Sequence, residues 1–193
     1  MAKAADSKGK TLAAAAKLFR QQGYHGTALQ DVLAAGGSPR GSLYFHFPGG
    51  KEEIGEAALT LAGEAVRQAI AHATETSEGA LVFLTRVARG MASDLEKSGF
   101  REGCPIATTA LETAAQSDVL GAATRGAFQK WETEISRGLE RFGMTSDDAG
   151  STATTVLSLL EGALLLARTY RSLEPMHRAE QALKLLLRAD RTI

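Results

Sequence analysis

Apolar residues along most of the chain recur at intervals of three and four, the spacing that places side chains on one face of an α-helix. In the first predicted helix they are Leu12, Ala15, Ala16 and Phe19. Similar stripes predict further helices over about 51–73, 78–97, 105–115, 118–142 and 149–171, and another from Pro175. We find neither the alternation typical of a strand nor an internal repeat. The sequence therefore predicts an all-α fold of about nine helices.

Two short helices are predicted between the first helix and the long helix that starts near Lys51. Thr27 and Gln30 have the spacing of a capping box, which predicts a helix start at Thr27. The glycines at 36–37 end that helix, and Ser38-Pro39 starts the next. Two short helices joined by a glycine-containing turn are typical of a helix-turn-helix, whose second helix enters the major groove of DNA.

The net charge of zero conceals an uneven distribution along the chain. Residues 1–51 carry seven basic side chains, namely Lys3, Lys8, Lys10, Lys17, Arg20, Arg40 and Lys51, and two acidic ones, Asp6 and Asp31. That segment has a net charge of about +5, and the remainder of the chain about −5. A positive head on a negative body favours an anionic partner for the head alone. The alternative is a solvated N-terminal segment that is basic without binding anything.

The second short helix carries side chains suited to DNA. Arginine reads guanine through a bidentate contact to O6 and N7, which makes Arg40 the candidate base reader. Tyr44 and His46 are stiff donors suited to phosphate oxygens. Lys51 occupies a helix's first turn, where a cation is unfavourable unless an anion binds there. The candidate DNA-binding residues are Thr27, Pro39, Arg40, Gly41, Ser42, Tyr44, Phe45, His46 and Lys51.

Each of these residues also has a simpler interpretation. Tyr44 could be part of the core, Thr27 could be only a helix cap, and Lys51 could be solvated. The combination of residue types nevertheless favours DNA binding.

These residues resemble a known family. The run Leu12–Phe19, the pair Gly23-Tyr24, and the segment Gly41-Ser42-Leu43-Tyr44-Phe45-His46-Phe47 before Lys51-Glu52 resemble the head of the tetracycline-repressor (TetR) family. Pro39-Arg40-Gly41-Ser42, Phe47-Pro48-Gly49-Gly50 and Gly103-Cys104-Pro105-Ile106 are similar to its lincomycin-repressor-like (LmrA-type) branch. Ser38 departs from the family, which usually has an apolar residue there, and the extra glycine before Lys51 could shift that lysine.

The resemblance implies a domain order and a mode of action. A DNA-binding domain over 6–66 would precede a regulatory and dimerisation domain over 67–193. The protein would be a cytoplasmic homodimer that binds double-stranded operator DNA without a cofactor or metal. A small-molecule effector would bind the helical body and release the operator, so the expected activity is that of a repressor.

The helix predicted over 149–171 has more apolar surface than one buried face requires. It lies either at the centre of the subunit or against a second subunit, and a helix-turn-helix that reads a palindrome needs a two-fold partner. We therefore expect dimerisation through this helix and the last one. The expected interface residues are Val156, Leu157, Leu160, Leu164, Leu183, Leu186 and Leu187.

The effector pocket is expected among inward-facing residues of the middle helices. The candidates are Leu95, Phe100, Cys104, Ile106, Phe128, Trp131 and Ile135, and each could equally be ordinary core. Cys104 precedes a proline at a helix start, where backbone amides can lower the pKa of a thiol. A redox-responsive regulator acting through Cys104 is therefore an alternative.

Several classes of protein fit the sequence poorly. No apolar run approaches the length of a membrane span, and the polar start predicts no secretory signal peptide. The four histidines, His25, His46, His72 and His177, have no metal-binding spacing, and no phosphate-binding glycine loop is present. The two competing hypotheses are a helical small-molecule carrier or enzyme with a structural basic head, and an architectural DNA binder without an effector.

Overall fold

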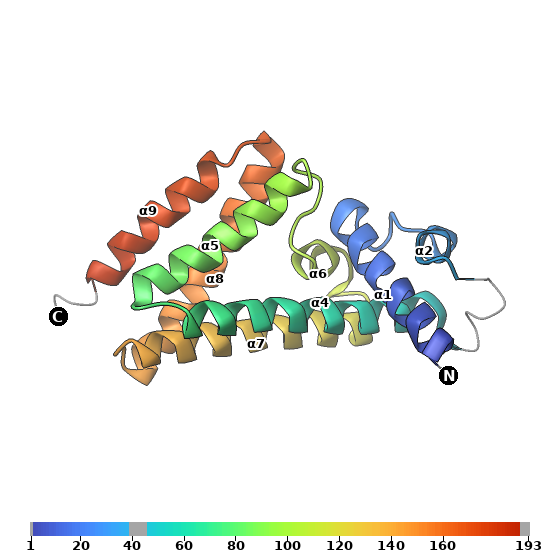
Figure 1. Ribbon diagram of the computed structural model, residues 1–193, viewed down its shortest axis with the longest axis horizontal. Helices are drawn as coiled ribbons and strands as arrows, with labels where there is room; N and C mark the ends of the chain where they lie inside the picture. Colours follow the sequence, from blue (N-terminus) through green and yellow to red (C-terminus); the bar gives the residue numbers. More distant parts are fainter. Residues whose placement is uncertain (1, 39–45, 190–193) are drawn as a thin grey trace. The chain divides into compact units, whose positions relative to one another are not determined.

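The computed structural model describes residues 2–38 and 46–189, and all regular elements in these ranges are α-helices (Figure 1). They are α1 (Ala2–Gln22), α2 (Leu29–Gly36), α4 (Gly50–Glu75), α5 (Ala80–Lys97), α6 (Ala107–Thr113), α7 (Asp118–Arg141), α8 (Ser146–Tyr170) and α9 (Glu174–Ala189). The all-α prediction is confirmed, with eight helices in the described ranges instead of about nine. The helix predicted from Pro39 to Phe45 lies outside them.

The chain divides into two compact units. The first comprises Met1–Glu64 and Cys104–Phe128, and the second comprises Ala65–Gly103 and Gln129–Ile193. Helices α4 and α7 each contribute residues to both units. The first unit therefore includes a segment, 104–128, that lies within the second domain expected from the sequence.

The first unit has its core beneath α1 and α2, which pack against each other. Its buried residues are Ala15, Phe19, Val32, Leu33, Phe47, Ile54 and Ala58. The predicted stripe of α1 supplies the first two of them. Helix α6, in the same unit, contacts α1. The short helices are thus held by one shared apolar core.

Three helices form most of the second unit: α5 and α8 both pack against α9 (Figure 1). Phe83 of α5 is fully buried, and its ring centroid lies 6.2 Å from that of Phe142. Thr145 caps α8 by accepting a hydrogen bond from the Asp148 amide at 3.3 Å. Arg171, in a left-handed conformation with φ 50°, ends that helix.

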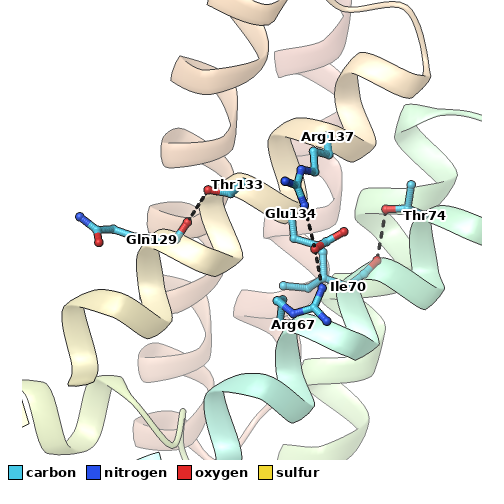
Figure 2. Close-up of polar contacts among 7 residues, drawn as sticks. All are labelled: Arg67, Ile70, Thr74, Gln129, Thr133, Glu134 and Arg137. Carbon is cyan, nitrogen blue, oxygen red and sulfur yellow. Dashed lines mark hydrogen bonds and ion pairs between the residues drawn. The ribbon is translucent and has the colours of Figure 1, made fainter. Parts of the chain in front are cut away.

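Polar contacts join α4 to α7 inside the second unit. Arg67 Nη1 lies 2.7 Å from Glu134 Oε2, and Arg137 approaches the same oxygen from the other side at 4.0 Å (Figure 2). The Thr74 and Thr133 hydroxyls donate to carbonyls one turn earlier in their own helices. The ion pair is therefore the polar link between the two helices in this view.

Helix α8 is long and apolar enough to cross a membrane, judged by length and composition alone. The sequence-based search for an uninterrupted apolar run did not find this helix, because serines, threonines and Glu161 interrupt its apolar residues. The helix has two aspartates in its first turn, and eight of its residues, from Ala149 to Ala167, are buried inside the protein. These features fit a helix at the centre of a folded unit, since core helices share the same composition.

Candidate nucleic-acid interface

The structure describes the residues on either side of the predicted recognition segment. Pro39, Arg40, Gly41, Ser42, Tyr44 and Phe45 lie outside the described residues, so their DNA contacts stay predictions. His46, which is described, is half-buried. The structure describes how the chain leaves α2 at Ser38 and how it enters the core again at Phe47, which is 2% exposed.

Helix α2 ends in a left-handed turn. Gly37 has φ 63° and donates its amide to Ala34 O at 3.2 Å, and the amide of Ser38 donates to Leu33 O at 3.0 Å. These two bonds form a Schellman motif, which favours glycine because a β-carbon is strained at positive φ. The prediction that glycine ends this helix is confirmed, and the turn of the helix-turn-helix starts at a fixed position.

Helix α1 holds this turn through a close approach and a hydrogen bond. A β-carbon on Gly36 would lie 2.9 Å from Thr11 Cα, so only glycine lets the two helices approach this closely. The hydroxyls of Thr11 and Ser38 are 2.7 Å apart and share a hydrogen bond. Thr11 is 2% exposed, so an apolar residue at 38 would remove a partner from a buried hydroxyl. The polar residue Ser38, at a position where an apolar residue is usual in the family that the sequence resembles, is therefore paired with the hydroxyl of Thr11.

Thr27 has a different role from the one predicted. Helix α2 begins at Leu29, and its N-cap residue, Ala28, makes no capping hydrogen bond through its side chain. The Thr27 hydroxyl donates to Gly23 O at 2.7 Å and accepts from Gln22 Nε2 at 3.3 Å. Thr27 is also fully buried. The capping-box prediction is thus wrong, and this burial favours a structural role for Thr27 over a direct phosphate contact.

Lys51 lies in the first turn of α4, as predicted. Its Nζ is 4.3 Å from the centroid of the Tyr24 ring, a cation–π contact, and the side chain is half-buried. Burial lowers the pKa of Lys51, and the carboxylate of Glu112 opposes this by attracting the charged form. Burial also raises the pKa of Tyr24, with Glu52 adding to the shift. The ammonium of Lys51 is thus partly desolvated, which strengthens its attraction to an anion.

Two further contacts, which the sequence did not indicate, tie this head to the segment 104–128. The amide of His25, just after α1, donates to Glu112 Oε2 at 2.7 Å. The Ser117 hydroxyl, which caps α7 by accepting from the Leu120 amide at 3.1 Å, donates to Glu52 Oε1 at 2.5 Å. The bonded residues are 87 and 65 positions apart, so no local sequence pattern could have revealed these bonds.

The predicted effector residues are divided between the two units. Cys104, Ile106 and Phe128 belong to the first unit, whereas Leu95, Phe100, Trp131 and Ile135 belong to the second. All are buried except Phe100 and Phe128, which are half-buried. Their grouping into one pocket stays a prediction.

Two of these residues have distinctive local geometry. Phe100 has φ 62°, which is unusual for a bulky residue, and follows Gly99, which has φ 64°. Cys104 is 6% exposed, and its Sγ accepts a hydrogen bond from the Ala107 amide at 3.4 Å. Because oxidation requires access to the sulfur, the burial of Cys104 favours a packing role over redox sensing.

The expected dimer residues lie mostly inside the subunit. Val156, Leu160, Leu164 and Leu183 are between 0% and 6% exposed, and Leu157, Leu186 and Leu187 are half-buried. The first four side chains pack within their own chain, so they have no surface left for a partner, and this corrects the sequence-based assignment. The large apolar residues that α8 does expose are Leu165, Leu166 and Tyr170, at 58%, 45% and 64%.

Two protein families match this sequence. Residues 12–58 match the family described as bacterial regulatory proteins, tetR family. Residues 80–182, more than half of the chain, match the family described as transcriptional regulator LmrA/YxaF-like, C-terminal domain. The first match includes the described α2 turn and Lys51, and the second includes α5, α6, α7 and α8.

Similar proteins cover nearly the whole chain. The HTH-type transcriptional regulator LmrA of Bacillus subtilis is 34% identical over 175 residues, 89% of this chain and 91% of that protein. The uncharacterised HTH-type regulator YxaF of the same organism is 31% identical over 95% of this chain and 96% of its own length. The crystal structure of a TetR transcriptional regulator from Chloroflexus aurantiacus superposes with a TM-score of 0.78 at 29% identity, covering 95% of this chain and 94% of that one.

Proposed function

The chain belongs to the TetR family of bacterial transcriptional regulators and has an LmrA/YxaF-like C-terminal domain, and on this basis we propose that it is a homodimeric repressor released from its operator by a small molecule. It is a DNA-binding transcriptional regulator and not an enzyme. Regulators of this family bind operator DNA as dimers and respond to small-molecule effectors. We place its activity in the cytoplasm, where operator DNA is accessible.

The fixed turn after α2 is the observation that carries the proposal for DNA. It starts the recognition segment 39–45 at a position held by Thr11. Within this segment Arg40 reads a guanine, and Pro39, Gly41 and Ser42 let it approach the bases. Tyr44 and His46 contact backbone phosphates, with Phe45 between them in the sequence. Lys51 binds a phosphate with its partly desolvated ammonium. Thr27 supports this arrangement from inside the head.

A gel-shift titration tests this proposal with the duplex immediately upstream of the protein's own coding region. We expect tight binding that survives random competitor DNA and weakens steeply with salt. Arg40→Ala should weaken binding to this duplex by about 1–3 kcal/mol and relax its sequence preference. Arg125→Ala, at an exposed arginine of α7, is the matched control. An Arg40→Ala protein with unchanged affinity and preference would remove the role assigned to Arg40.

We place the dimer contact on the exposed α8 face, defined as Leu165, Leu166 and Tyr170. Together with the exposed Gly162 and Thr169, these residues recur at intervals of three and four along α8. They therefore form one stripe, which differs from the buried stripe through Val156 and Leu160. An exposed apolar stripe of this kind is what a two-fold interface between identical subunits needs.

Sedimentation analysis of charge substitutions tests the interface. Leu166→Glu should raise the dimer dissociation constant at least tenfold, because a charge would be buried without a partner. Leu111→Glu, at a leucine of α6 that is 83% exposed in the first unit, should leave the dimer unchanged. Equal weakening by both variants would show that the effect comes from added charge and not from the exposed α8 face.

For the effector we propose a predominantly apolar small molecule bound within the second unit, in the region of Trp131 and Ile135. The chain has a single tryptophan, Trp131, which is 2% exposed, so its fluorescence reports on this region alone. Titration with the amphipathic dye 1-anilinonaphthalene-8-sulfonate should give saturable energy transfer from Trp131. Ile135→Glu, one turn away on α7, should abolish saturation. Non-saturable transfer in the wild type would oppose a pocket near Trp131.

A further inference from the structure

Lys8 continues the inner face of α1 beyond its apolar part. Thr11, Ala15 and Phe19 follow it at intervals of three and four residues, and they are 2%, 0% and 1% exposed. Lys8 itself is exposed. The buried stripe of α1 thus ends in an exposed ammonium group. The packing of the core does not require a lysine at this position.

The side chain of Lys8 is anchored beside the recognition segment. Its Nζ lies 5.3 Å from the ring centroid of Phe47, which is buried and follows the segment 39–45 closely. One turn further along α1, the Thr11 hydroxyl bonds to Ser38 at the other end of that segment. Residues 8–11 of α1 therefore contact both flanks of the segment proposed to enter the major groove.

We propose that Lys8 binds a backbone phosphate of the duplex beside the recognition segment. The ammonium has three N–H donors, and a ring contact leaves donors available to an anion. Ordering a lysine side chain costs rotamer entropy, and anchoring it on Phe47 removes part of that cost before DNA arrives. The contact is independent of base sequence, because every nucleotide carries the same phosphate.

This inference rests on the proposed function, since it assigns Lys8 to the same DNA-binding surface. The competing interpretation is a cation–π contact that only stabilises the head. The two interpretations differ in one measurable quantity. A phosphate contact changes the salt dependence of DNA binding, because counterions are released when it forms, and a contact internal to the protein does not.

The experiment compares the full-length wild type with Lys8→Met, Lys8→Arg and Lys17→Met. Methionine keeps a flexible apolar stem against Phe47 and removes the charge, whereas arginine keeps both. Lys17 is an exposed lysine nine residues further along α1, about 14 Å along the helix axis. The slope of log affinity against log salt is measured on the upstream duplex and on a random duplex of equal length. Thermal unfolding is recorded for each variant.

For Lys8→Met we expect the slope to flatten by about 0.9 on both duplexes, with equal fold losses of affinity. Lys8→Arg should keep the wild-type slope, and Lys17→Met should flatten it by less than half as much. A Lys8→Met slope equal to that of Lys17→Met overturns the proposal, and a lowered unfolding temperature alongside it would assign Lys8 to packing alone.

The proposed function can fail separately from this inference. It fails if the wild type binds the upstream duplex, and sites selected from random sequences, no better than random DNA. The slope on the random duplex still decides the role of Lys8 in that case.

Discussion

The contacts that stabilise each of the two units internally are of different kinds. In the first, the short helices α2 and α6, of 8 and 7 residues, pack beside α1, and polar bonds between distant residues, such as Thr11 with Ser38 and His25 with Glu112, add to the shared apolar core. In the second, α5, α8 and α9, of 18, 25 and 16 residues, pack along apolar stripes. A helix of seven or eight residues buries little surface, so directional bonds help the apolar core to fix the orientation of α2 and α6. Long helices bury enough, and α8 can leave one face available to a partner.

The largest effect should come from emptying the core of each unit in turn. Phe19 and Phe83 are matched, since both are phenylalanines no more than 1% exposed, one in each unit. Each substitution by alanine should lower the free energy of unfolding by about 3–5 kcal/mol, because it removes apolar contacts and leaves a cavity. In hydrogen exchange, Phe19→Ala should deprotect α1 and α2 first, and Phe83→Ala should deprotect α5 and the C-terminal part of α7 first.

Two controls accompany this comparison. Leu185→Ala, at a leucine 67% exposed on α9, should change stability by less than about 0.5 kcal/mol. DNA affinity should fall more for Phe19→Ala than for Phe83→Ala under conditions where both proteins are folded. Equal deprotection of both units by either variant would show that the chain opens as one cooperative body, and the contrast between the units would then have no energetic basis.

Periodic stripes made most of the fold predictable. The helices predicted from Leu12, Leu84, Phe128 and Leu183 are present with boundaries close to those expected, because each stripe must be buried whatever the details of packing. Glycine at positive φ marked the end of α2 equally well. These signals are local, so a single sequence contains them fully.

Long-range features were not predictable in the same way. Leu160 and Leu166 are both leucines of the apolar helix α8, yet Leu160 is buried and Leu166 is 45% exposed. Which face packs inward depends on where α9 lies, and this information is absent from the helix itself. Thr27 likewise bonds backwards to Gly23 because the chain turns there, although its spacing to Gln30 fits a cap.

A smaller loss of stability is expected when one polar bond is removed from each unit in turn. Thr11→Val and Ser38→Ala, measured alone and together, should give a coupling energy of about 1 kcal/mol in thermal unfolding, since each leaves the other hydroxyl without this partner. Thr133→Val in the second unit removes an exposed bond to Gln129 O and should change stability by less than about 0.5 kcal/mol (Figure 2). Additive effects of the Thr11 and Ser38 substitutions would mean that this bond does not hold the turn.

The smallest effect concerns the ion pair between α4 and α7. Arg67 and Glu134 are 30% and 13% exposed, so water screens their attraction only partly. Arg67→Met should lower the free energy of unfolding by about 0.5–1 kcal/mol, less at high salt, with Arg137 at 4.0 Å limiting the loss. The matched control is Arg178→Met, because the pair Arg178–Glu174 is 75% and 59% exposed and should contribute close to nothing. If the two variants lose equal stability, partial burial adds nothing to the α4–α7 pair, and apolar packing alone joins these helices in the second unit.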